Sequence, residues 1–520
     1  MNRAAMLLFG AFVLPAVQGC QVPLRPYRLQ HPAIEIAAKA GNGSSLTQAT
    51  PDKDCVRAGA PICLAFIEVD DMGEMFDKAE LDTALSVIRR ANRYAEATAS
   101  PSGPVVITFI HGWKNNAAPD NGNVAGFEAA LRDLYQRLHR TRPVIGIYIG
   151  WRGNLIRKAW PVAQQLSYYN REAAATRIPG ATLASALTQI AVRTHENRRA
   201  QAIFIGHSFG GLLLERAISE ATASSIAQAT IYTQEGGALP RGSPEAAEKL
   251  RLAAAATDAR ADLVIFINPA GAATEAKQML DFLLENGYRY QPGMQSSATG
   301  PGDPSADKAA DRPLFVSLTS TADLATKVAV PIGHAWPDLR FRMAGSFRNL
   351  SDKPNGNYRL SCFDPHAEPE YREITTKQQG ALPQSSYYMN TAPHMQILQS
   401  HLMLKAVSAR QMQVSSTGQK ITIHNPRAIA ECNRDLFNQE HLNIVSTFRL
   451  FDTQTCFAIQ ERPNRCNGSP YWLMEIDPDV VPDHSTIFTQ RFIDFLIDTF
   501  FLTPEGRPIE RISPRLTEKH

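Results

Sequence analysis

The sequence has no excess of charge of either sign. Its 520 residues include 53 lysines and arginines against 50 aspartates and glutamates, which leaves a formal net charge of +3. Proteins that hold a nucleic-acid backbone need a basic surface, so this balance gives no indication of a nucleic-acid partner. With 44% hydrophobic and 20% charged residues, the composition is that of a folded globular protein and excludes a mainly disordered, collagen-like or coiled-coil chain.

The sequence also lacks the short motifs of metal and redox sites. It contains no C-x-x-C pair and no H-E-x-x-H. Both are typical spacings for zinc ligands, and the first is also typical of thioredoxin-like redox proteins. We therefore expect neither a zinc site nor a redox function.

The apolar run Met6–Val17 is too short for a membrane span, which needs roughly 20 helical residues. It follows Arg3, and such a run is typical of a secretory signal, so residues 1–19 are predicted to be a signal peptide. Residues 17–20 read VQGC, which resembles the lipobox of bacterial lipoproteins. The resemblance implies a lipid on Cys20 and the membrane as a partner; the alternative is an ordinary signal peptide and an unmodified thiol. In both cases the mature chain is expected in the bacterial cell envelope, lipid-anchored or periplasmic, or secreted.

Six further cysteines would lie in an oxidising compartment, where an even number favours disulfides over free thiols. The sequence does not choose among the pairings that six cysteines allow. Short loops favour Cys55 with Cys63 and Cys456 with Cys466, which leaves Cys362 with Cys432.

Residues 20–60 contain proline, glycine and serine without sustained periodicity and are predicted to be a flexible tether. From residue 61 onward, short apolar runs alternate with stretches long enough for helices, the first over 78–96 and the last over 487–501. Fully apolar strands joined by helices predict an α/β fold with a mostly parallel sheet buried on both faces. The predicted strands are 64–69, 105–110, 144–149, 202–205, 263–267, 314–318 and 471–476.

Two segments depart from this alternation. The first, residues 334–442, is rich in proline, asparagine, glutamine and aromatic residues and is predicted to be an inserted cap. In the other, Gly236, Gly237 and Pro240 interrupt an alanine-rich helical pattern. The predicted organisation is a core over 61–333 and 443–505, the cap over 334–442, a smaller insertion near 224–260, and a C-terminal tail over 506–520.

A serine motif follows the predicted strand 202–205. Residues 206–211 read GHSFGG and lead directly into an apolar helical run. G-x-S-x-G between a strand and a helix is typical of a nucleophile elbow, in which the serine occupies a strained turn and the glycines let the strand and helix pack closely. This context predicts Ser208 as the nucleophile.

The strand 105–110 ends in FIHGW, residues 109–113. Together with the GHSFG elbow, this strand end resembles the α/β-hydrolase fold family, in particular its bacterial serine hydrolases. The resemblance covers about 63–333 and 443–502 and implies a Ser–His–acid triad and esterase or lipase chemistry. It also implies an oxyanion hole formed by the backbone N–H groups of Trp113 and Phe209. We interpret His111 as a structural residue that shapes this loop.

In this family the serine precedes the acid and the acid precedes the histidine, so both partners should lie downstream of Ser208. Asp323 follows the strand 314–318 and is the predicted acid. Glu275 is its competitor, whereas Asp311 fits only a surface residue. His484 lies in the loop between the last predicted strand and the last helix and is the predicted base.

Other histidines fit the role less well. His207 belongs to the elbow, with its side chain expected to point away from the serine hydroxyl, and His195 precedes the elbow. The long separation of Asp323 from His484 keeps open the alternative that a residue of the insertion supplies the base. The histidines in or near the insertion are His334, His366, His394, His401, His424 and His441.

These residues predict a serine hydrolase that cleaves carboxylic esters or lipid-like acyl substrates through an acyl-enzyme, with no metal or organic cofactor. Two alternatives stay open: a membrane-tethered binding or scaffold protein on the same fold, and an acyltransferase that uses the same triad. Aromatic residues in the segment 150–169 either line an acyl pocket or belong to a helix packed on the sheet.

Overall fold

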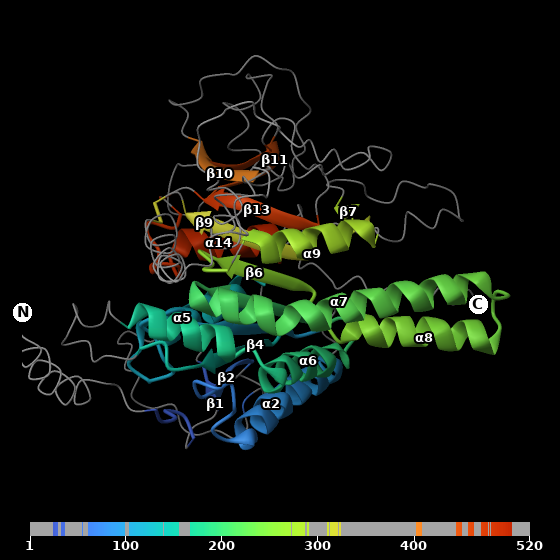
Figure 1. Ribbon diagram of the computed structural model, residues 1–520, viewed down its shortest axis with the longest axis horizontal. Helices are drawn as coiled ribbons and strands as arrows, with labels where there is room; N and C mark the ends of the chain where they lie inside the picture. The colour runs from blue at the N-terminus through green and yellow to red at the C-terminus, as the bar shows by residue number, and fades with distance from the viewer. Residues whose placement is uncertain are drawn as a thin grey trace, which may run out of the picture.

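The structure is a computed structural model in which an α/β fold is built on one large, mostly parallel sheet (Figure 1). Among its described residues, no helix is both long and apolar enough to cross a bilayer. The residues described are 24–29, 33–36, 55, 61–98, 103–138, 140–154, 167–271, 273–286, 289–290, 309–310, 313–320, 322–323, 402–407, 444–449, 456–461, 470–476, 478 and 480–501.

The main sheet has 11 strands in the order β1-β2-β4-β3-β5-β6-β9-β13-β10-β12-β11. The neighbours from β2 to β10 in this order are all parallel, whereas β1, β12 and β11 pair antiparallel at the two edges. A separate pair joins β7 (Arg289–Tyr290) to β8 (Ala309–Ala310). The strands of the main sheet are β1 Ala33–Glu35, β2 Ile62–Glu68, β3 Val105–Ile110, β4 Val144–Gly150, β5 Gln201–His207, β6 Leu263–Ile267, β9 Phe315–Ser320, β10 Leu402–Val407, β11 Ile444–Arg449, β12 Cys456–Glu461 and β13 Tyr471–Ile476.

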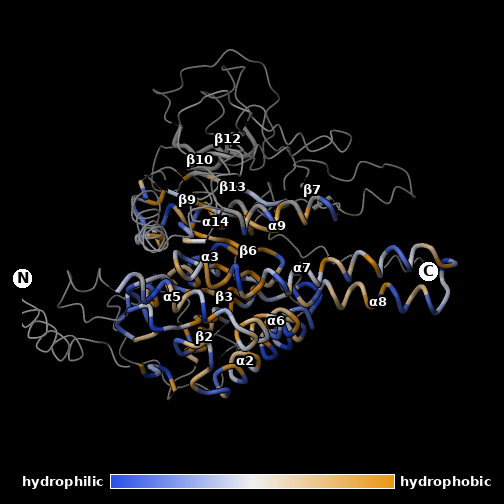
Figure 2. The backbone as a smooth tube through the Cα atoms, in the orientation of Figure 1, coloured by the Kyte–Doolittle hydropathy of each residue, from blue (hydrophilic) through white to orange (hydrophobic). Residues whose placement is uncertain are grey.

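The helices cover both faces of this sheet. Strand side chains alternate between two cores, so that Cys63 and Ala65 of β2 face one and Leu64 and Phe66 face the other. The first core packs against α2 (Lys78–Ala97), α5 (Tyr168–Arg177), α6 (Ala181–His195), α7 (Phe209–Ala238) and α9 (Ala273–Glu285), and the second against α3 (Gly122–Arg137) and α14 (Gln490–Phe500). Burial on both faces explains why the strands are almost continuously apolar, as the orange strands of Figure 2 show.

The strand order has a topological switch point between β3 and β5. The connection after β3 passes through α3 to β4, whereas the connection after β5 passes through α7 to β6 on the other side. Loops that leave adjacent parallel strands in opposite directions open a crevice at their carboxyl ends, which is where open α/β sheets bind ligands. The loop after Ile110 and the turn at Ser208 lie at this switch point.

The smaller predicted insertion is a helical hairpin. α7 continues through Gly236 and Gly237 and ends at Ala238, before Pro240, and α8 (Pro244–Asp258) returns beside it. The expected break at the two glycines is therefore wrong. A Cβ on Gly236 would lie 3.3 Å from Lys249 and Leu250 of α8, so this glycine allows close packing of the two helices. Figure 1 shows the hairpin extending beyond the sheet.

Parts of the predicted tether are ordered. Residues 33–35 form β1, and Cys55 is joined to Cys63 by a disulfide. This bridge is the pairing expected for these two cysteines, while the other predicted pairs lie outside the described side chains. Of the predicted cap, only β10 is described, and it extends the sheet beside β13.

Candidate active site

Ser208 occupies the tight turn between β5 and α7. Its φ of 56° and ψ of −122° lie in a region that L residues rarely adopt, and its side chain is almost completely buried. The turn is fixed by Ser208 N–H, which donates to the Ile267 carbonyl at 3.0 Å, and by the Ser208 carbonyl, which accepts from Ala270 N–H at 3.2 Å. A Cβ on Gly206 would lie 2.6 Å from the Gly210 carbonyl, so the strand and helix pack too closely for a larger residue. Ser208 thus has the tight strand–turn–helix geometry that the motif predicts, and its role as a nucleophile stays a prediction.

The structure brings Ser208, His484 and Asp323 together. His484 Nε2 lies 2.7 Å from Ser208 Oγ, and His484 Nδ1 lies 2.9 Å from Asp323 Oδ2. Because Nδ1–H donates a hydrogen bond to the carboxylate, the proton of the neutral ring stays on Nδ1, and Nε2 can accept the serine proton. Asp323 is completely buried, whereas the His484 side chain is 22% exposed. This arrangement can accept the proton of an attacking hydroxyl and orient the imidazole for that transfer.

The loop that carries His484 is held by three polar residues at strand ends. His207 Nε2–H donates to the His484 carbonyl at 2.7 Å, and Asn268 Nδ2 donates to the same oxygen at 3.2 Å. Asn268 Oδ1 also accepts from Ser320 N–H at 2.9 Å, and Ser320 Oγ donates to the Val481 carbonyl at 2.5 Å. These hydrogen bonds are not predicted from the sequence. Their only signal in the sequence is a polar residue directly after, or at the end of, an apolar strand.

Burial keeps His207 neutral in this position. Desolvation, with a smaller contribution from nearby His484, lowers the pKa of His207 to about 3. An uncharged ring beside the His484 ring avoids repulsion between two imidazolium groups when His484 takes up a proton. His207 lies next to Ser208 in the chain, but its described hydrogen bond goes to the histidine loop.

The loop after β3 lies against the elbow. A Cβ on Gly112 would be 2.8 Å from the Ser208 Cβ, so only glycine permits this approach. The next residues are fixed by Lys114, which has a φ of 68° and donates its N–H to the Gly153 carbonyl at 2.9 Å. Phe209 begins α7, and an N–H group in the first turn of a helix has no partner within the helix. Trp113 and Phe209, the residues predicted to bind an oxyanion, thus follow directly after Gly112 and Ser208, the two residues that meet in this contact.

His111 has no contact with the reacting groups among its described hydrogen bonds. Its Nδ1–H donates to the Gly112 carbonyl at 2.9 Å, and its Nε2 accepts Trp151 N–H at 3.1 Å. Complete burial lowers the pKa of His111 to about 4, so the ring stays neutral and keeps both bonds. These contacts are those of a residue that shapes the loop, as interpreted from the sequence.

Aromatic side chains adjoin the elbow. The Tyr168 ring lies 5.5 Å from the Trp113 ring and 5.2 Å from the Phe209 ring, and Trp113 Nε1–H donates to Ser167 Oγ at 3.2 Å. Tyr168 begins α5, so this part of the segment 150–169 is a helix that packs beside the site. The other aromatic side chains of that segment, beyond Trp151, lie outside the described residues.

The remaining candidates are elsewhere. Glu275 lies in the first turn of α9 and pairs with Arg216 of α7 at 2.9 Å. His195 binds Asp262 at 2.9 Å near the start of β6. Asp311 and the six histidines of the insertion lie outside the described residues.

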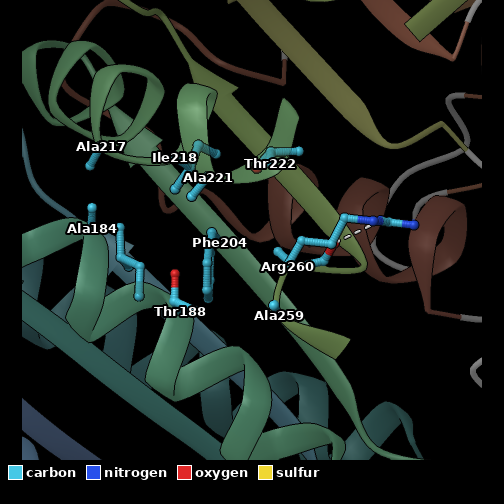
Figure 3. A pocket seen from close by; sticks show the side chains of 11 residues that line it. Ala184, Thr188, Phe204, Ala217, Ile218, Ala221, Thr222, Ala259 and Arg260 are labelled. Atoms are coloured by element: carbon cyan, nitrogen blue, oxygen red, sulfur yellow. Dashed lines mark hydrogen bonds between the residues drawn. The ribbon is translucent and has the colours of Figure 1, made fainter. Parts of the chain in front are cut away.

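A hollow on the face of the sheet that α6 and α7 cover is separate from this site. It lies between α6, α7 and the end of α8, and Phe204 of β5 forms part of its wall (Figure 3). Phe204 precedes Ser208 by four strand residues, or about 13 Å. Over the described ranges, no group of three or more histidine, cysteine, aspartate or glutamate side chains is arranged to hold a metal ion.

Comparison of the chain with protein-family models, with curated proteins and with solved structures finds no match.

Proposed function

We propose that this protein is a serine hydrolase with the α/β-hydrolase fold, which cleaves carboxylic esters or lipid-like acyl substrates in the bacterial cell envelope. The observation that supports the proposal most strongly is the continuous contact from Ser208 Oγ through the His484 imidazole to the buried Asp323 carboxylate. The residues of this relay come from three separate loops at the carboxyl end of one sheet. A purely structural serine has no need of such an arrangement.

In the proposed first step, the Ser208 hydroxyl attacks the ester carbonyl carbon while His484 Nε2 takes the hydroxyl proton. Asp323 stabilises the imidazolium that forms and keeps Nδ1 protonated throughout. The N–H groups of Phe209 and Trp113 bind the oxyanion, and His484 then returns the proton to the leaving alcohol. An acyl-enzyme on Ser208 remains.

In the proposed second step, water attacks the acyl-enzyme with His484 again as the base, which releases the carboxylic acid and restores the serine. The position of Ser208 at the start of α7 adds the positive end of the helix dipole to the stabilisation of negative charge. The neutral state of His207 leaves His484 as the imidazole that exchanges protons in both steps.

The test is hydrolysis of p-nitrophenyl esters of increasing acyl length by the mature protein, with Ser208→Ala as the matched control. We expect turnover that falls by a factor of about 10³ or more in the variant. Equal rates for the two proteins would contradict the proposal and favour the binding or scaffold alternative. Adding an acceptor alcohol separates hydrolysis from acyl transfer, because an acyltransferase would form the new ester in preference to the acid.

A further inference from the structure

A short N-terminal segment is fixed across the carboxyl edge of the sheet. The Glu68 carboxylate, at the end of β2, accepts both Tyr27 N–H and Arg28 N–H at 2.6 Å. The buried Arg28 guanidinium lies 4.1 Å from the Phe66 ring centroid, and its Nε–H donates to the Ala117 carbonyl at 2.7 Å. Residues 24–29 therefore form a strap that crosses from β2 to the loop after β3.

This strap lies on the same edge as Ser208. β2, β4, β3 and β5 are adjacent and parallel, so Glu68, the last residue of β2, and Ser208, directly after β5, both lie at carboxyl ends of strands. Three strand spacings separate β2 from β5, which is about 14 Å. The strap and the nucleophile are thus near neighbours on one edge of the molecule.

A hydrogen-bonded turn at this edge carries an exposed apolar side chain. The Asp70 carboxylate accepts Met72 N–H at 2.8 Å and Glu74 N–H at 3.0 Å, and the Glu68 carbonyl accepts Phe76 N–H at 3.1 Å. Met72 is 64% exposed. Because Glu68 binds both the strap and this turn, the two lie side by side.

The exposed large apolar side chains of the described chain gather on this edge. Leu24 and Leu29 of the strap are each 45% exposed, so three of the five belong to the strap or the adjoining turn. The other two, Val192 on α6 and Ile231 on the α7–α8 hairpin, are 44% and 50% exposed. Because they lie elsewhere on the surface, they serve as matched controls for the experiments below. Exposed apolar residues next to a binding site are typical of a surface that meets a partner or a membrane.

The sequence that precedes the strap indicates which partner this is. Only residues 21–23 separate Leu24 from Cys20, the residue expected to carry the lipid. Four extended residue steps span at most about 14 Å. A lipid on Cys20 would therefore hold the strap, and with it the edge that carries Ser208, close to the bilayer.

We propose that this edge lies against the membrane surface and that Ser208 receives an acyl ester directly from the bilayer. The inference rests on the proposed function, in both the serine chemistry and the lipid anchor. The edge carries exposed acids, Glu74 and Asp120, as well as Arg25 and Lys114. With mixed charge, the contact depends on the anchor and on the apolar side chains, and it does not require anionic lipid.

The orientation can be measured without activity. Hydrogen–deuterium exchange is compared between the lipidated chain on phosphatidylcholine vesicles and the soluble Cys20→Ala chain. We expect exchange in peptides that span 24–29 and 70–76 to slow by about threefold or more, as for amides shielded from water. The hairpin turn 239–243 should be unchanged. No slowing at the edge, or equal slowing at the hairpin turn, would overturn the proposal.

A second measurement tests substrate entry. The double variant Leu29→Ser, Met72→Ser should lose about tenfold of its rate on an ester embedded in vesicles, because two apolar contacts with lipid are removed. Its rate on a soluble short-chain ester should not change. The matched double variant Val192→Ser, Ile231→Ser should retain both rates. An equal loss on both substrates, or equal losses in the two double variants, would overturn the proposal.

Failure of the proposed function would be visible separately. If a fluorophosphonate leaves Ser208 unlabelled, the proposed chemistry fails and, with it, delivery of an ester to Ser208, while the exchange pattern still decides the orientation. If the mass of the N-terminal peptide shows no lipid on Cys20, the anchored orientation is overturned, whatever the labelling of Ser208.

Discussion

Nε2 of His207 lies 2.7 Å from the main-chain oxygen of His484, so the residue beside the proposed nucleophile also holds the loop of the proposed base. Asn268 Nδ2 reaches the same oxygen at 3.2 Å. Residues at the ends of two strands, β5 and β6, therefore fix the position of the His484 main chain relative to Ser208. The position of the imidazole depends on these contacts as well as on Asp323.

Replacing His207 should reduce the rate of the chemical step more than substrate binding. His207→Phe removes one hydrogen bond to the loop, worth about 1 kcal/mol, and kcat should fall by about fivefold to tenfold with little change in KM. The measurement is steady-state kinetics on a soluble ester. His195→Phe is the matched control, because His195 is a buried histidine that also bonds a main-chain carbonyl, but at the opposite edge. A fall in kcat of similar size in both variants would contradict a positioning role.

The packing of the elbow predicts opposite effects for two glycines of α7. A Cβ on Gly210 would lie 2.5 Å from the His111 carbonyl and closer still to that of Ile110, whereas a Cβ on Gly237 has no atom within 4 Å. Gly210→Ala should lower the free energy of unfolding by about 3 kcal/mol or more. Gly237→Ala should raise it by about 0.5–1 kcal/mol through helix propensity. Denaturant unfolding measures both, and equal effects would contradict the close contact between α7 and β3.

Glu80 predicts a loss of stability as the pH rises from about 4.5 to about 8. Burial, with a smaller contribution from neighbouring Glu68 and Asp77, raises the pKa of Glu80 to about 8. Because this folded value exceeds the unfolded value of about 4.5, the folded state binds the extra proton, and stability is lost as pH rises between the two values. Glu80→Gln keeps the group neutral and should stabilise the protein at pH 9 by on the order of 2 kcal/mol, with little effect at pH 4.

The control for this prediction is Glu96→Gln, which changes an exposed carboxylate on the same helix. Thermal unfolding at several pH values should show no comparable gain for this variant. A gain for Glu80→Gln that is equal at pH 4 and pH 9 would show that the carboxyl does not titrate as expected.

Much of the fold was predictable because local patterns and burial agree. The runs at 105–110, 263–267 and 471–476 were predicted with the bounds that the strands have, since each is an apolar run buried on both faces. The helix over 78–96 was predicted nearly to its end because its apolar face repeats with helical spacing, and the structure shows that Asp77 also caps its first turn. Short apolar runs between helices leave few other arrangements.

Other features depend on contacts between distant residues. α7 continues through Gly236 and Gly237 because α8 packs against it, and helix propensity alone does not reveal such a partner. Residues 27 and 28 are fixed by Glu68, which lies 40 positions away from Arg28. That segment has no sustained periodicity, so nothing in the sequence signals this contact.

The candidate site shows the same division. Ser208 was recognisable because the elbow needs glycines at fixed positions within a few residues. Asp323 and His484 were predicted from chain order and from their place after predicted strands. The structure places these two residues in contact with each other. The supporting roles of His207 and Asn268 could not be predicted, since a hydrogen bond to the His484 carbonyl depends on where three loops meet.

The most direct test of the account is covalent labelling of the purified mature protein with a fluorophosphonate, with the labelled residue identified by peptide mass spectrometry. Such probes react with serines that a neighbouring base activates. We expect labelling confined to Ser208 in the wild type and no labelling in Ser208→Ala. In His484→Ala and in Asp323→Asn, labelling of Ser208 should be slower by a factor of about 10³ or more. Labelling at another residue, or equal labelling of Ser208 in the wild type and in His484→Ala, would contradict an activated serine at this site.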